Sequence, residues 1–397
     1  MVVTVRGWRK FLMISVPAAL VALLLAACAI ELWVRATWDE RNGRPGFFLS
    51  DAVRGQRLAA GYDGWFAGVP VHINSLELRD PREYALEKRP NTFRILVLGD
   101  SVTFGHGSVY EHTYPYLLEQ RLKAWRPDVD WQVWNAAVPG YNTSQELAQL
   151  LEVGERFKPD LVVVGFFWND LSGNQPVQPA GRLWSALVRA SSFARRYLYS
   201  FEFYKRAYLT ARWRLSGTKE DRLRAEHAQG DQALLAVNDT GPSKEELTAF
   251  DRLTDDDVRR NICVYGMKPG PEALAAIEGD AGYPRWIEAV HGFQQLQRAG
   301  RYRVVFFVND VPPVCHEADM FYDGGTKAID DFYLRVLGAE TPATTSYDAF
   351  LHVRPSQMPN ATAHPTGNSN VVKADALFDF LRGRVLPSLT REAHGSD

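Results

Sequence analysis

The chain has 397 residues, of which 46% are hydrophobic, 12% aromatic and 23% charged. This composition excludes a generally disordered protein and is sufficient for one large domain with elaborations. The 45 basic and 47 acidic residues leave a formal net charge of −2. Because no overall positive field attracts phosphates, we expect no nucleic-acid partner.

The N-terminal segment is expected to enter a membrane. Arg6, Arg9 and Lys10 precede an uncharged apolar stretch over residues 11–30, which is about the 20 residues that a spanning helix requires. Acidic residues follow only after this stretch, so the positive-inside rule places the body of the protein outside the cytoplasm. We therefore expect a single-pass protein of the inner (cytoplasmic) membrane. Residues 1–36 are expected to form its cytoplasmic stub and anchor, and its body is expected to be extracytoplasmic, in the periplasm.

Other fates of this segment stay open, and the cysteines bear on them. Ala26 and Ala27 offer a site for signal-peptide cleavage. The run Leu25-Ala26-Ala27-Cys28 resembles a bacterial lipobox, in which Cys28 is lipidated. Cys263 and Cys315 either pair in an oxidising compartment or stay as unpaired thiols, because sequence gives no distance between them.

Along the chain, residues 37–90 form a lead-in segment without a clear period or readable chemistry. From there strands and helices alternate, and the apolar strands are those expected of a parallel sheet buried on both faces. This succession predicts an α/β fold, a three-layer α/β/α sandwich with a mostly parallel sheet. The predicted strands are 93–98, 131–135 and 161–167, and the predicted helices are 114–124 and 144–157.

A helical insertion at about 176–285 interrupts a domain predicted over 91–390. Its first part, 182–215, is rich in basic and aromatic residues, with Glu202 as its only acid. Two interpretations stay open: this part binds anionic headgroups or lines a substrate cleft, or it is a lid helix that packs its aromatic residues on the domain. After the insertion we expect helices at 286–299, 329–337 and 370–386 and strands at 303–308 and 347–352.

One candidate nucleophile stands out. The run Gly99-Asp100-Ser101 follows the first predicted strand directly, and Gly105 completes the turn. A serine hydroxyl needs a base to remove its proton, and the oxyanion that then develops needs donors already in place. On its own, Asp-Ser after a strand is also a common helix cap.

Three further segments supply these groups. Gly140 follows the second strand, Asn169 follows the third, and His364 lies in a loop before the last helix. Each is by itself an ordinary loop residue, but open parallel sheets place their ligand sites at the carboxyl ends of strands. His106 and His112 lie too close to the serine in sequence to point at it well, and are interpreted as rim residues.

In this order and at these spacings, the four segments resemble the four blocks of the SGNH (GDSL-type) hydrolase superfamily, in its bacterial membrane-tethered members. The resemblance implies a flavodoxin-like fold with Ser101 as nucleophile and His364 as base. It also implies an oxyanion hole formed by the Ser101 and Gly140 N–H groups and the Asn169 side chain. No metal and no organic cofactor is expected.

The sequence departs from the family pattern at one position. Family members usually carry an Asp three residues before the His, and here that position is Ala361. Such an Asp orients the imidazole and stabilises its charged form. Either a Ser-His dyad suffices, or Asn360 or Asp348 orients His364, or the domain is catalytically weakened.

The expected function is that of a serine ester hydrolase. Its expected substrates are acyl esters, with O-acetyl groups as one candidate, on a cell-envelope carbohydrate or lipid. An O-acyltransferase acting on a polysaccharide would use the same residues, and a binding domain that has lost turnover is the third interpretation.

Overall fold

The computed structural model describes residues 5–38, 45–67, 69–171, 181–217, 271–309, 315–316, 319–320, 327–350, 360–361, 364–365 and 368–387. Most of the second half of the insertion and Cys263 lie outside these residues. The two alternatives for Cys263 and Cys315, a disulfide or two unpaired thiols, therefore both stay open.

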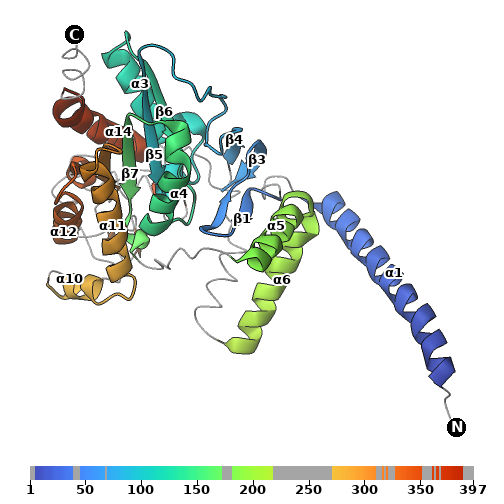
Figure 1. Ribbon diagram of the computed structural model, residues 1–397. Helices are drawn as coiled ribbons and strands as arrows, with labels where there is room; N and C mark the ends of the chain where they lie inside the picture. Colours follow the sequence, from blue (N-terminus) through green and yellow to red (C-terminus); the bar gives the residue numbers. More distant parts are fainter. Residues whose placement is uncertain are drawn as a thin grey trace.

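A five-stranded parallel sheet forms the centre of the body (Figure 1). Its order is β11-β8-β7-β5-β6, with every neighbouring pair parallel. Renumbered within the sheet, this is the 2-1-3-4-5 order of flavodoxin-like doubly wound folds. The predicted fold class is confirmed. The strands are β5 (Thr92–Gly99), β6 (Asp130–Asn135), β7 (Leu161–Phe166), β8 (Val304–Val308) and β11 (Ala343–Thr345).

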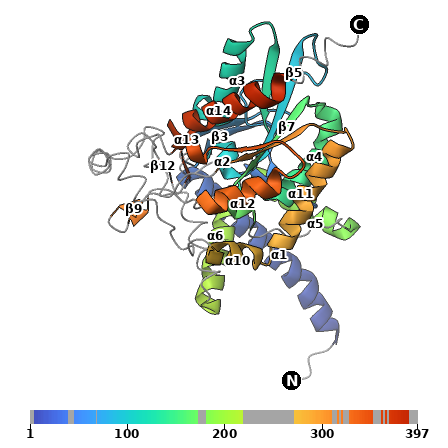
Figure 2. The ribbon, with the colours of Figure 1, turned by 90° about the vertical axis from the view of Figure 1, so that its left-hand side faces the viewer.

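Helices cover both faces of the sheet and complete three layers (Figures 1 and 2). One face packs on α4 (Thr143–Phe157), α11 (Tyr283–Arg298) and α12 (Lys327–Leu337). The other packs on α3 (Tyr114–Trp125) and α14 (Asn368–Phe380), which a π-helical turn at Leu381–Val385 extends. Burial on both faces explains why the strands are continuous apolar runs rather than alternating ones.

The lead-in segment packs against the same body. It forms two antiparallel hairpins, and their apolar side chains make a third core cluster with Phe104, Val138 and Tyr141. These three residues belong to the turns that follow β5 and β6, so the lead-in segment supports the edge of the sheet where the site is expected. Its strands are β1 (Phe48–Asp51), β2 (Gly55–Leu58), β3 (Tyr62–Phe66) and β4 (Val69–Ile73).

The strand predicted at 347–352 is wrong. Strand β11 ends at Thr345, and a helical turn, α13 (Tyr347–Phe350), follows it. The Thr345 hydroxyl accepts a hydrogen bond from the Tyr347 N–H at 3.0 Å, and the Phe350 N–H donates to the Ser346 carbonyl. A hydroxyl that accepts a hydrogen bond from the N–H two residues further along favours a turn over a continued strand, whatever the β propensity of the aromatic residues after it. The other predicted strands and helices that fall on described residues are confirmed to within a few residues.

Two elements project from the body on one side (Figure 1). Helix α1 (Val5–Thr37) contains the predicted anchor, and its stretch Met13–Thr37 is long and apolar enough to cross a membrane and has no buried residue in its most apolar window. Beside its C-terminal end lies a helical hairpin of α5 (Arg182–Tyr197) and α6 (Tyr199–Ser216). The end of the insertion, by contrast, packs on the body through Ile277 of α10 (Pro271–Glu278).

Candidate active site

Three predicted site residues follow three adjacent strands. Ser101 comes after β5, Gly140 after β6 and Asn169 after β7. Strand β5 lies between the other two, and Gly99 at its end is in register with Gly165 of β7. The chain after β6 stays close to β5, because the Val138 N–H donates to the Gly99 carbonyl at 2.9 Å. The fold therefore brings the three segments to one edge of the sheet.

Ser101 begins a short helix, α2 (Ser101–Phe104), and is 7% exposed. Asp100 caps this helix, since its Oδ1 accepts a hydrogen bond from the Val102 N–H at 2.9 Å. The Ser101 hydroxyl donates to the other oxygen of Asp100 at 3.4 Å. The sharp exit from the strand is thus held by a side-chain cap next to the candidate nucleophile.

Two glycines make room for the helix that carries Ser101. A Cβ on Gly99 would lie 2.3 Å from Thr103 Oγ1, and a Cβ on Gly165 would lie 2.2 Å from the same atom. Thr103 is buried and accepts hydrogen bonds from the Tyr114 hydroxyl at 3.1 Å and the Asn309 side chain at 3.2 Å. A buried cluster of polar side chains therefore lies under α2, and it leaves no room for a side chain at position 99 or 165.

Gly140 lies in an exposed turn with φ of +80°, which glycine adopts without strain. The lead-in segment holds this turn from outside. The Gln56 side chain donates to the Pro139 carbonyl at 2.8 Å, and the Tyr141 hydroxyl donates to the Gln56 carbonyl at 2.6 Å. The position of the predicted oxyanion donor thus depends on β2 as well as on β6.

Asn169 is half-buried in the middle of a 3₁₀ turn, Trp168–Asp170, directly after β7. Asp170 is fully buried and closes this turn by accepting a hydrogen bond from the Phe167 N–H at 3.3 Å. The Asp170 side chain therefore has a structural role in this turn.

His364 reaches the same edge from the other end of the chain. It lies in β13 (His364–Pro365), which has α-carbons within 8 Å of those of α2. The start of α14 is held nearby, because the buried Asn370 side chain donates to Ser108 Oγ at 3.0 Å. The fold therefore brings the strand that contains the predicted base beside the short helix that begins with the predicted nucleophile, although the two residues are more than 250 positions apart in the sequence.

The two candidate orienting residues differ in placement. Asn360 lies in β12 (Asn360–Ala361), the antiparallel partner of β13, where Ala361 pairs with His364. Asp348 is 61% exposed on α13, and its carboxylate forms an ion pair with Lys327 at 3.0 Å. Asn360 therefore lies in the same β-hairpin as His364, whereas the Asp348 carboxylate is paired with Lys327 at the surface.

Sequence reasoning missed Arg79, which it left in a lead-in segment without chemistry. Arg79 is buried, and its guanidinium donates to the Phe104, Gly105 and Ser108 carbonyls. It also lies over the Phe104 ring at 4.4 Å. Arg79 therefore fixes the end of α2 and the loop after it. No local period or motif marks such a contact in the sequence.

A buried carboxyl group lies near Asp100. Glu146 of α4 is fully buried, and neither of its carboxyl oxygens has a hydrogen-bond partner among the residues that the structure describes. Burial, and then the charge of Asp100, raise the pKa of Glu146 well above 4.5. The pKa of Glu146 is higher in the folded than in the unfolded state, so the protonated carboxyl group stabilises the fold below about pH 4.5. This contribution is lost as the pH rises toward the raised pKa.

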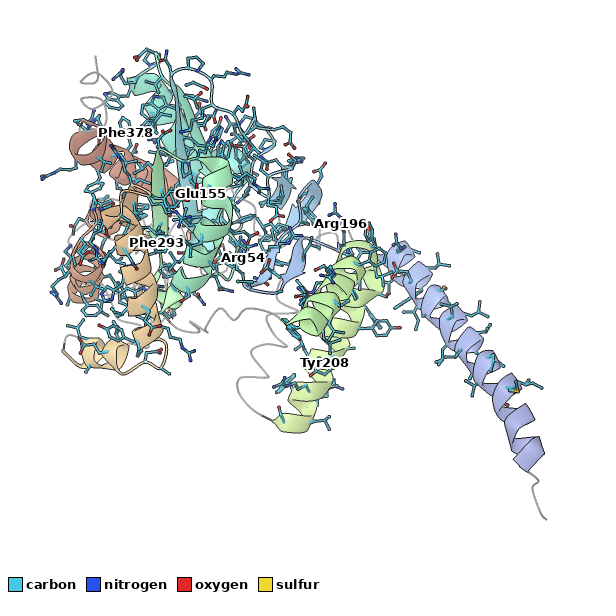
Figure 3. All side chains as sticks on the ribbon, in the orientation of Figure 1. Arg54, Glu155, Arg196, Tyr208, Phe293 and Phe378 are labelled. Carbon is cyan, nitrogen blue, oxygen red and sulfur yellow. The ribbon has the colours of Figure 1, made fainter. Side chains whose placement is uncertain are left out.

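Glu146→Gln is therefore expected to raise the free energy of unfolding by about 1–3 kcal/mol at about pH 7.5, and to change it little at about pH 4. Thermal unfolding of both proteins at the two pH values measures this. The matched control is Glu155→Gln on the same helix, where the carboxylate is exposed and pairs with Arg301 (Figure 3). An equal effect of Glu146→Gln at both pH values would show that the carboxyl group does not titrate as described.

Comparison with known protein families indicates the class of enzyme to which this site belongs. The model of the GDSL-like lipase/acylhydrolase family matches residues 97–258. Residues 97–258 belong to this family. The chain therefore contains a segment of the GDSL-like lipase/acylhydrolase family, which supports an ester hydrolase. The matched segment contains Ser101, Gly140 and Asn169, and it ends before His364.

Solved structures similar to this chain include esterases, and no curated protein matches its sequence significantly. Axe2, an acetylxylan esterase from Geobacillus stearothermophilus, is 12% identical over 73% of this chain and 93% of its own, with a TM-score of 0.33. TesA is 15% identical over 73% and 98%, with a TM-score of 0.35. A two-domain esterase (CEX) active on acetylated mannans is 14% identical over 73% and 49%, with a TM-score of 0.37. Similarities of this size carry no argument about the substrate of this chain.

Proposed function

We propose that this GDSL-type ester hydrolase is a membrane-anchored serine esterase that uses Ser101 and His364. The observation that carries the proposal is the meeting of four separate segments at one edge of the sheet. Ser101, Gly140 and Asn169 follow adjacent strands, and β13 with His364 lies beside α2. A nucleophile, a base and oxyanion donors are the groups that acyl transfer to water requires.

The proposed reaction has two steps. Ser101 Oγ attacks the ester carbonyl while His364 takes its proton, and the oxyanion is held by the Ser101 and Gly140 N–H groups and Asn169 Nδ2. His364 then protonates the departing alcohol, and an acyl-enzyme remains. Water, deprotonated by His364, attacks the acyl-enzyme, and His364 returns this proton to Ser101 Oγ as the carboxylic acid leaves.

These steps use protein groups and water alone. Within the described ranges, no group of three or more His, Cys, Asp or Glu side chains is placed to hold a metal ion. The expectation that no cofactor takes part rests on the chemistry of the serine pathway, in which the amide donors supply the electrostatic stabilisation.

We further propose that Asn360 orients the imidazole of His364. Asn360 belongs to the strand that pairs with β13, whereas the Asp348 carboxylate pairs with Lys327 at the surface. An amide that accepts the second ring N–H fixes the tautomer without adding a charge. A Ser-His dyad with no orienting side chain is the alternative outcome of the test given in the Discussion.

For substrate and place we propose acyl esters, O-acetyl groups among them, on an envelope carbohydrate or lipid outside the cytoplasmic membrane. The support is the apolar stretch Met13–Thr37 of α1 and the basic residues Arg6, Arg9 and Lys10 before that stretch, which favour a cytoplasmic N-terminus and a periplasmic body. An esterase anchored in this membrane lies close to the acylated molecules of the cell envelope.

A fluorophosphonate probe tests the nucleophile in the detergent-solubilised full chain. We expect the probe to label the wild type and not Ser101→Ala, and we expect this variant to lose esterase activity by about 10⁴-fold or more. Ser144→Ala is the matched control, because Ser144 lies in the first turn of the helix after the next strand. It should keep both labelling and activity.

Absence of labelling in a folded wild type would overturn the proposal. Product analysis with a sugar acceptor then separates the two enzymatic outcomes. Release of free acid supports the esterase, whereas acyl transfer to the sugar identifies a transferase with the same site.

A further inference from the structure

The hairpin of α5 and α6 joins the anchor to the catalytic body. Ser192 Oγ donates to the Ser50 carbonyl at 2.8 Å, which fastens α5 to β1. At the other side, the Tyr199 and Ser200 N–H groups at the start of α6 donate to the Glu31 carboxylate of α1 at 3.1 and 2.9 Å. The hairpin is thus attached both to the helix that would cross the bilayer and to the lead-in segment that supports the Gly140 turn.

The hairpin also lies on the bilayer side of the molecule. Figures 1 and 2 both show α6 running from the C-terminal end of α1 back toward the side on which the N-terminus lies. The aromatic ring of Trp33 in α1 meets that of Phe203 in α6, with ring centroids 6.0 Å apart. Helix α6 has 18 residues, or about 27 Å of length, so it extends along or into the headgroup layer if α1 spans the membrane.

Its side chains are those of an interfacial surface rather than of a lid. Large apolar and aromatic residues that a lid would bury on the domain are exposed instead: Leu187 is 56% exposed and Tyr208 is 62% exposed. Tyr208 lies on α6 clear of the helices that cover the sheet (Figure 3). We define the hairpin surface as these exposed residues: Leu183, Trp184, Leu187, Phe193, Tyr197, Phe203, Tyr204, Tyr208 and Leu215.

Positive charge accompanies these apolar residues. Arg189, Lys205, Arg212 and Arg214 are exposed on the same two helices, and Glu202 is the only acid in the sequence from 182 to 215. Aromatic rings favour the boundary between headgroups and acyl chains, and arginine and lysine bury their stems there while their charges reach anionic phosphates. The combination matches an anionic lipid surface, and the attachment to α1 brings that surface within reach.

We propose that the α5–α6 hairpin lies in the interface of the bilayer that holds α1 and binds anionic phospholipid headgroups. This inference rests on the proposed anchoring by α1. Because the hairpin is fastened to β1, its contact with lipid sets the height and tilt of the catalytic edge above the membrane. The enzyme would thereby work at a fixed distance from the lipid surface instead of swinging freely on its anchor.

The test uses the full chain reconstituted in vesicles, with Cys28, Cys263 and Cys315 replaced by Ser. A single cysteine carrying an environment-sensitive fluorophore is introduced as Leu187→Cys or Tyr208→Cys. The matched control is Leu151→Cys, which is similarly exposed but lies on α4 of the body. Vesicles of phosphatidylcholine, with or without phosphatidylglycerol, carry brominated acyl chains as quenchers.

We expect quenching at 187 and 208 to exceed quenching at 151 at least about twofold, to grow with phosphatidylglycerol and to fall with salt. Arg189→Glu with Arg212→Glu should reduce the dependence on phosphatidylglycerol. Vesicle flotation separates the two proposals. A chain that floats while 187 and 208 stay as unquenched as 151 overturns the inference and leaves the anchor intact, and a chain that does not float overturns the anchoring and the inference with it.

Discussion

His364→Ala is expected to lower kcat/KM for a simple ester by about 10⁴-fold while the protein stays folded. Without the imidazole, the Ser101 hydroxyl would have to pass its proton to the Asp100 carboxylate, which accepts its hydrogen bond at 3.4 Å and is a much weaker base than an imidazole. The measurement is the rate of p-nitrophenyl acetate hydrolysis, with thermal unfolding as the check on folding. The wild-type rate should also rise with pH as the imidazole loses its proton, because only the neutral ring can act as the base.

His291→Ala is the matched control, because His291 is exposed on α11 away from the site. It should leave the rate and its pH dependence unchanged. A His364→Ala protein with nearly wild-type kcat/KM would remove the base from the proposed mechanism, although Ser101 could still be the nucleophile.

The same assay identifies the orienting group. If Asn360 holds the imidazole, Asn360→Ala lowers kcat by about 10-fold or more and leaves KM little changed, because the interaction matters most when the ring is charged. Asp348→Ala should have no effect on kcat, since its carboxylate pairs with Lys327 at the surface. If neither change lowers the rate, a dyad without an orienting side chain is the better description.

Gly165→Ala is expected to have the largest effect on the structure of the site. The added Cβ would lie 2.2 Å from Thr103 Oγ1, 2.7 Å from the Tyr114 hydroxyl and 2.8 Å from Asn309 Nδ2. Three such contacts in a closely packed core force the polar cluster apart, at a cost of about 3 kcal/mol in the free energy of unfolding. Because Thr103 belongs to the same short helix as Ser101, the displacement should also lower kcat/KM by about 10²-fold.

Thermal unfolding and ester hydrolysis of the purified variant measure both effects. Gly383→Ala is the control, because a Cβ there meets no atom within 4 Å, and it should be neutral or slightly stabilising. Adding Thr103→Ala to Gly165→Ala removes the shortest contact and should recover part of the stability. A Gly165→Ala protein with wild-type stability and rate would contradict the described packing under α2.

Much of the fold could be predicted because its signals are local. The apolar runs of β5 and β7 are buried on both faces, so their composition alone marks them as strands of a parallel sheet. The Asn142 side chain and Gln145 form the capping box that starts α4, a signal contained within four residues. The prediction of a strand at 347–352 failed, because the turn held by the Thr345 hydroxyl outweighed the β propensity of the residues after it.

For the site, the residue types and the turns that carry them could be read from the sequence. Ser101, Gly140 and Asn169 each follow a strand, and the sheet order places those strands side by side. Their surroundings depend on long-range contacts that only the fold creates: β13 beside α2, Arg79 on the carbonyls after α2, Glu146 near Asp100 and the hairpin beside α1. These contacts join residues far apart in sequence, and their energy comes from packing and burial, which no local pattern encodes.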